Sequence, residues 1–110
     1  MDLFGMMGKM GKLKEEIANL NDEMDAKELH LSGASDMLQI TVSGNKEIRN
    51  ISINESMFRP EFKDELEDQL VVLINQAINE ADIQKKAEFK ERTEGMMPNI
   101  PGLDLSGFGL

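Results

Sequence analysis

The sequence contains no cysteine, no tryptophan and no tyrosine, and its only aromatic residues are five phenylalanines. The lack of cysteine excludes disulfides, thiolate metal sites and a cysteine nucleophile. The lack of large aromatics means that any hydrophobic core must be aliphatic. A chain of 110 residues with 40% apolar content therefore predicts one domain with a thin core, which a partner chain would help to bury.

Long hydrophobic runs are also missing. No apolar run of about 15 residues occurs, and the Met-rich start is interrupted by Gly5, Gly8 and Gly11, so we expect neither a membrane span nor a secretory leader. The formal net charge is −9, from 12 basic and 21 acidic residues. Taken as an average, this charge argues against a phosphate-binding surface. We expect a cytoplasmic protein with no membrane partner.

A regular apolar stripe near the start is the first positive signal. Its residues follow one another at alternating steps of three and four: Leu3, Met6, Met10, Leu13, Ile17, Leu20 and Met24. This pattern predicts a helix from Leu3 to about Asp25, ~33 Å long. A narrow stripe with a period of 3.5 is typical of a seam between two helices, although an ordinary amphipathic core remains the alternative. We expect the seam to be buried, partly against a second chain.

Three short stretches then alternate apolar and polar residues. They are "KELHLSG" (27–33), "MLQITVSGN" (37–45) and "EIRNISIN" (47–54), and they predict three consecutive antiparallel strands. Residues 32–36 are expected to form a five-residue hairpin loop, and Gly44-Asn45 a second turn. Ile48 falls on the opposite face from Ile51 and Ile53, which predicts a bulge or a two-sided strand end.

The best signal is a second helix. Pro60 suits the first helical position, a broad apolar face follows, and Gly95 is a plausible cap. The order predicts an α+β fold, α-β-β-β-α, in which this helix covers the apolar face of a three-stranded antiparallel sheet and both helices overhang it. We expect one domain over residues 1–94, and a disordered or loosely docked Gly/Met/Pro-rich tail over 95–110.

The apolar stripes of the overhanging helices would be exposed to solvent in a single chain, so we predict a homodimer with projecting helical arms. The candidate interface residues are Met10, Leu13, Ile17, Leu20, Leu70, Leu73, Ile74 and Ile78.

Catalytic chemistry finds little support. His30 lies between Leu29 and Leu31 in a predicted strand and has no partner at motif spacing, so we interpret it as a solvent-facing or hydrogen-bonded residue. The acidic clusters lie on exposed helix faces without the loop that a calcium site needs. The Gly-Lys pairs of "GMMGKMGK" lack the phosphate-loop pattern. We expect no enzyme, no cofactor, no metal and no small-molecule substrate.

The distribution of charge is more informative than its sum. Two basic clusters stand near the outer ends of the helices, whereas residues 61–82 carry one base and seven acids. Such ends could contact phosphates independently of sequence, or the lysines could merely solubilise the helices, and charge alone leaves both readings open. The candidate phosphate contacts are Lys9, Lys12, Lys14, Lys85, Lys86, Lys90 and Arg92.

Four segments together resemble the YbaB/EbfC family of bacterial nucleoid-associated proteins: "LFGMMGKMGKLKEEI", "LQITVSGNKEIRNISIN", "LEDQLVVLINQAINEA" and "GMMPNIPGL". The resemblance runs over nearly the whole length and keeps the order of the elements. It implies a homodimer with arms like tweezers, a place on the nucleoid, and binding of double-stranded DNA that compacts or bends the duplex and influences transcription. The acidity of this chain departs from that expectation, and we predict weak, salt-sensitive binding.

The alternative function is a protein-interaction module of the adaptor or chaperone type. It would use the adaptable methionines Met6, Met7 and Met10 of the first helix together with the Met96-Met97 pair of the tail.

Overall fold

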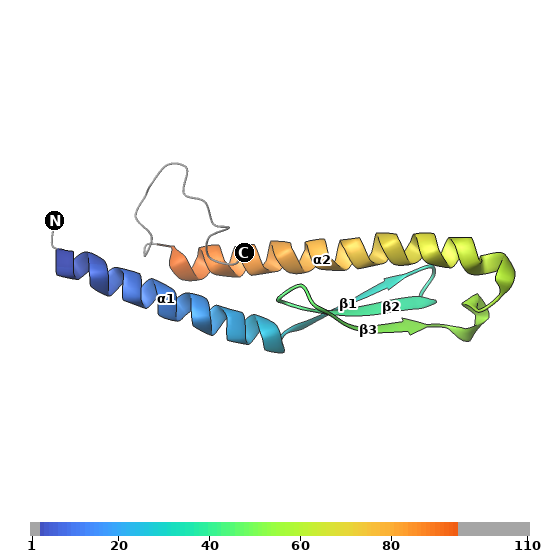
Figure 1. Cartoon of the computed structure of the whole chain (residues 1–110), viewed down its shortest axis with the longest axis horizontal. Helices are drawn as coiled ribbons and strands as arrows, with labels where there is room; N and C mark the ends of the chain where they lie inside the picture. Colours follow the sequence, from blue (N-terminus) through green and yellow to red (C-terminus); the bar gives the residue numbers. More distant parts are fainter. Residues whose placement is uncertain (1–2, 95–110) are drawn as a thin grey trace.

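Figure 1 shows one long helix that runs along the three-stranded sheet and continues beyond it, where the other long helix lies at its side. The computed structural model describes residues 3–94. Its elements are α1 (Leu3–Ala26), β1 (Glu28–Gly33), β2 (Leu38–Ser43), β3 (Ile48–Ile53), the 3₁₀ turns Glu55–Met57 and Pro60–Phe62, and α2 (Lys63–Thr93). The predicted α+β order is confirmed. The tail expected over 95–110 lies outside the described residues.

The sheet is an antiparallel meander with β2 in the centre. Leu38 of β2 faces Ile53 of β3, and a bulge at Thr41/Val42 brings Ile48 opposite Val42. The predicted bulge is therefore confirmed, and it returns Ile48 to the apolar face. The β1–β2 loop is shorter than expected, because the last residues of β1 still pair with β2.

The main core lies between the sheet and α2. Leu38, Ile40 and Val42 of β2 are buried against Leu73, Ala77 and Ala81 of α2. The spacing of these helical residues places them on one face, where two alanines allow the helix to approach the sheet closely.

The sequence predicted that the second helix covers the whole sheet, but α2 leaves part of the third strand uncovered. It packs on β1 and β2, and Ile51 of β3 remains 41% exposed. A helix about 10 Å wide spans roughly two strands at a spacing of about 4.8 Å, so a single helix cannot cover three. Ile51 consequently lies open beside α2, whereas Ile48 and Ile53 of β3 are partly buried against the core.

The second helix also begins later than predicted. Pro60 opens a 3₁₀ turn with Arg59 as its N-cap, and the α-helix starts at Lys63. Proline still occupies a first helical position, where its missing N–H costs no hydrogen bond, but this position opens a 3₁₀ turn, which is tighter than an α-helical turn.

Beyond the sheet, α1 and the second half of α2 lie side by side (Figure 1) and form what we call the arm, residues 3–26 and 82–93. Leu20 and Met24 of α1 are buried with Phe89 of α2, and Ile17 packs against them. The molecule is 68 Å long as a result. The seam of α1 at Leu20 and Met24 is thus covered by the same chain, where we had expected a partner to contribute.

Candidate nucleic-acid interface

The arm carries all seven predicted phosphate contacts, but the structure divides them into three groups. Lys9, Lys12 and Lys14 lie on the outer half of α1, and all three are exposed. Within residues 3–94 none of them forms an ion pair. Their ammonium groups are therefore available to a phosphate without the loss of an existing contact.

The cations of α2 are mostly engaged. Arg92 forms an ion pair with Glu23 across the arm, and its Nε lies 3.5 Å from the Glu88 carboxylate. Lys86 Nζ lies 2.9 Å from Asp82. Lys90 is exposed and has no ion pair in the described part of the chain. A duplex would thus find one unpaired ammonium group on α2, and would have to compete for two cations.

Lys85 is a special case, because only 5% of its surface is exposed. Removal from water lowers the pKa of the Lys85 ammonium, nearby Lys46 lowers it further, and Asp82 opposes both effects. The Lys85 side chain is therefore sheltered from solvent near Lys46 of the β2–β3 turn and Asp82 of its own helix. Direct phosphate contact remains a prediction that its burial does not favour.

The ion pair between Arg92 and Glu23 fastens the two helices of the arm. The hydrogen bond from Arg92 lowers the pKa of the Glu23 carboxyl group, and the bond to Glu23 raises the pKa of Arg92. Arg92 Nε also forms an ion pair with the carboxylate of Glu88, one turn earlier in the same helix. Its charge is therefore used to hold α1 against α2.

Sequence reasoning missed Lys46. It lies in the turn between β2 and β3 with a positive φ of 70°, and its Nζ is 3.2 Å from Asp82 of α2. The two residues are 36 positions apart, and no local pattern in the sequence connects them. The signal that could have found Lys46 is its place next to the Gly44-Asn45 turn, which fixes where the end of the hairpin must lie.

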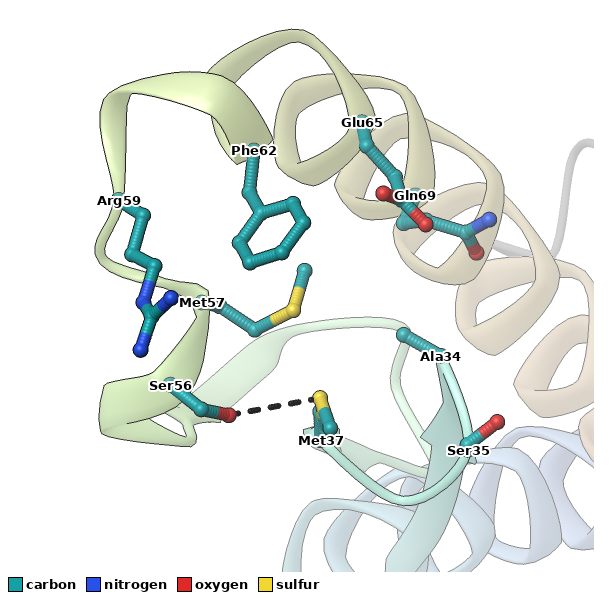
Figure 2. A pocket seen from close by; sticks show the side chains of 9 residues that line it. All are labelled: Ala34, Ser35, Met37, Ser56, Met57, Arg59, Phe62, Glu65 and Gln69. Carbon is teal, nitrogen blue, oxygen red and sulfur yellow. Dashed lines mark hydrogen bonds between the residues drawn. The ribbon is translucent and has the colours of Figure 1, made fainter.

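The opposite end of the molecule has different chemistry. A pocket of about 570 Å³ lies between the β1–β2 loop and the start of α2. Figure 2 shows the Phe62 ring and Met57 at its centre, and the hydroxyl of Ser56, which donates a hydrogen bond to the Met37 sulfur. Its charged lining consists of one acid, Glu65, and one base, Arg59. The pocket therefore offers no cationic surface for nucleic acid.

The remaining candidates behave as ordinary surface groups. His30 Nδ1 lies 3.0 Å from Thr41 Oγ1 on the exposed face of the sheet, as the sequence predicted. Among residues 3–94, no group of three or more His, Cys, Asp or Glu side chains could hold a metal ion. No helix in the same range is long and apolar enough to cross a membrane.

The predicted dimer-interface residues differ in how far they are buried within the single chain. Leu13, Leu20 and Leu73 are buried within one chain. Ile17, Leu70 and Ile74 are partly buried, and Met10 and Ile78 are exposed. If two copies associate, the exposed members and their neighbours are the ones that can meet.

Comparison with known proteins gives concordant results. A model of the YbaB/EbfC DNA-binding family matches residues 1–96. A nucleoid-associated protein of Flavobacterium johnsoniae is 36% identical over 104 residues, 94% of this chain and 96% of the relative. Another, from Afipia carboxidovorans, is 30% identical over 104 residues, 94% and 97% of the two chains. An uncharacterized Helicobacter pylori protein of known crystal structure shares the fold, with a TM-score of 0.73 at 18% identity over 79% of this chain and 91% of that one.

Proposed function

The chain belongs to the YbaB/EbfC DNA-binding family, and from that membership we propose that it binds double-stranded DNA as a homodimer, largely independently of sequence, and alters the conformation of the duplex. Its place would be the nucleoid, in the cytoplasm. Effects on nucleoid organisation and gene expression would follow from the altered path of the DNA.

The observation that carries this proposal is the exposed lysine set of the arm. It consists of Lys9, Lys12 and Lys14 on α1 and of Lys86 and Lys90 on α2. Lysine presents a compact charge that donates to phosphate oxygens in many orientations, and such contacts position a protein on DNA without reading bases. The acidic body would be kept away from the duplex, so that the arm alone approaches it.

A homodimer is supported by an unfilled apolar border. Ile51 pairs with buried Ile40 and so faces the side of the sheet that α2 covers only in part. Ile74, Ile78 and Asp82 follow one another at helical spacing on one side of α2. Asp82 pairs with Lys46 in the turn that leads into β3, which indicates that this side of the helix faces β3. Val71, 61% exposed, completes what we call the border strip: Ile51, Val71, Ile74 and Ile78.

Two-fold pairing through the border strip would remove these side chains from water in both copies. It would also present two arms at a set distance, so that one duplex could be gripped at two places. Two chains of −9 carry a formal −18, which will weaken the complex as a whole. We therefore expect modest affinity with a strong dependence on salt.

The experiment is a titration of random-sequence duplex with the purified protein at low and physiological salt. Because lysines displace counterions from phosphates, we expect affinity to fall roughly 10³-fold between about 50 mM and 200 mM salt. Replacing Lys9, Lys12 and Lys14 together by Gln should lower the salt slope by about one unit for each lost contact. Replacing Arg59 and Lys63 by Gln removes two positive charges at the far end; this control for charge loss away from the arm should leave the slope unchanged. Absence of binding at about 50 mM salt would refute the proposal.

A second candidate function is favoured by one observation. Met7 and Met10 are exposed near the outer end of α1, and unbranched thioether side chains adapt to varied apolar partners. A non-enzymatic adaptor would use this surface. If the protein fails to bind duplex at low salt but captures a protein partner that the Met7→Gln/Met10→Gln variant does not, this alternative replaces the first.

A further inference from the structure

A cluster of lysines surrounds one carboxylate where the sheet meets the arm. Lys46 Nζ lies 3.2 Å from one oxygen of Asp82, and Lys86 Nζ lies 2.9 Å from the other. The two lysines come from different elements, the β2–β3 turn and α2. One carboxylate is thus held between two ammonium groups, in the manner of a bridging anion.

The cluster is electropositive even with the carboxylate in place. Lys85 also stands close enough for Lys46 to lower its pKa and for Asp82 to raise it, and the two lysines that contact Asp82 directly already outnumber its single charge. The hydrogen bond from Lys86 lowers the pKa of Asp82, burial acts against it, and Lys46 lowers the pKa further. Asp82 therefore stays ionised at neutral pH and satisfies part of a site that attracts anions.

The cluster is accessible from solvent. The side chain of Lys86 is 53% exposed, and those of Lys46 and Asp82 are each 27% exposed. Lys90 follows Lys86 by four residues, which places it about 6 Å further along the same side of the helix. Lysines thus continue from the hairpin turn onto the arm.

We propose that Lys46 and Lys86 bind a DNA phosphate at the base of the arm and that Asp82 takes the place of that phosphate in the free protein. This inference rests on the proposed function. A phosphate oxygen accepts from ammonium groups as a carboxylate does, and it can bridge the same pair. Binding then has to overcome the attraction between Asp82 and its two lysines.

The first test removes the new contact. Lys46→Gln should weaken binding of a random duplex and lower the salt slope by about one unit, whereas Lys46→Arg should bind like the unaltered protein. The matched control is Lys63→Gln. Lys63 forms a comparable ion pair, 2.6 Å from Glu67, at the other end of α2, so its loss changes net charge and pairing equally without touching the base of the arm.

The second test removes the competing carboxylate. Asp82→Asn should tighten DNA binding several-fold more than Glu67→Gln, because both variants lose one negative charge from an i,i+4 pair but only the first releases lysines next to the arm. Thermal unfolding without DNA should show that all five variants are folded.

The outcomes separate this inference from the proposed function. If the unaltered protein binds no duplex, the function itself is wrong. If it binds, and Lys46→Gln behaves like Lys63→Gln, Lys46 is not a phosphate contact. If Asp82→Asn behaves like Glu67→Gln, Asp82 does not compete with DNA. Weakening by Lys46→Gln together with tightening by Asp82→Asn supports both parts.

Discussion

Gly44 shows how one residue can hold three elements together. Its N–H donates to the carbonyl of Lys27, 2.9 Å away, where α1 passes into β1. A Cβ atom built on Gly44 would lie 2.7 Å from the Met24 carbonyl oxygen. The hairpin turn that carries Lys46 can approach α1 this closely only because position 44 has no side chain.

Gly44→Ala should therefore destabilise the protein. Because the nearest atom is backbone, the turn and the end of α1 must move apart, and we expect a loss of about 1–3 kcal/mol in the free energy of unfolding, measured by chemical denaturation. Gly11→Ala is the control, because nothing lies within 4 Å of a Cβ at that helical position. Equal stability of the Gly44→Ala and unaltered proteins would contradict the close approach.

Lys85 and Lys90 differ in burial, although their sequence neighbourhoods are alike. Both follow the apolar row of α2 in a basic segment, yet the first is buried and the second exposed. At about 100° per residue, five positions turn the two side chains roughly 140° apart around the helix, so that they lie on different sides of it. One basic segment therefore contains both a buried lysine and a lysine that is open to solvent.

At the scale of elements, the arm depends on contacts between α1 and α2. Phe89 is 1% exposed and lies against Leu20 and Met24. Phe89 is the aromatic member of this cluster, and its ring contributes a large buried apolar surface. Outside the cluster, the ion pair of Arg92 with Glu23 adds a polar contact that responds to pH.

The arm should loosen in acid. The pKa of Glu23 in the folded protein lies below its ordinary value of 4.5, so its ionised form favours folding. This contribution is complete above pH 4.5 and is lost as the pH falls through the lowered folded value. We expect the melting temperature to fall more steeply below this pH for the unaltered protein than for Glu23→Gln.

Asp22→Asn is the control for the acid experiment. Asp22 is exposed on the same helix and has no ion pair among residues 3–94. Its replacement should keep the full acid sensitivity. If Glu23→Gln and Asp22→Asn melt in parallel with the unaltered protein across the acid range, the ion pair contributes nothing to the arm.

At the scale of the whole molecule, the sheet and the arm occupy different parts of a long rod (Figure 1). The border strip lies beside the sheet, and the free lysines Lys9, Lys12 and Lys14 lie along the outer part of the arm. Association of two copies through the border strip and contact of DNA with Lys9, Lys12 and Lys14 would therefore use separate surfaces. A dimer could then form without covering these three proposed phosphate contacts.

The dimer can be tested by charge insertion. Val71→Lys/Ile78→Lys should convert the protein into a monomer, because two buried ammonium groups per copy would lack partners. Val72→Lys/Ile83→Lys is the matched control, since these residues are 61% and 53% exposed on another side of α2. Sedimentation at micromolar concentration should distinguish the two. A folded single chain in the unaltered protein would refute the homodimer.

The sequence by itself determined the elements and their order. A repeat of three and four residues predicted both helices, and alternation predicted all three strands and the bulge near Ile48, because these patterns depend on neighbours a few positions apart. The two basic clusters could be located for the same reason. The resemblance of the four segments also sufficed to indicate the family.

Only the tertiary structure decided what each cation does. Two ion pairs join residues far apart in the chain: Arg92 with Glu23, and Lys46 with Asp82. The burial of Lys85 likewise depends on the folded structure. The same holds for Ile51, which α2 leaves open because one helix is too narrow for three strands. Such contacts follow from how the elements pack against one another in space, and a local pattern carries no information about that distance.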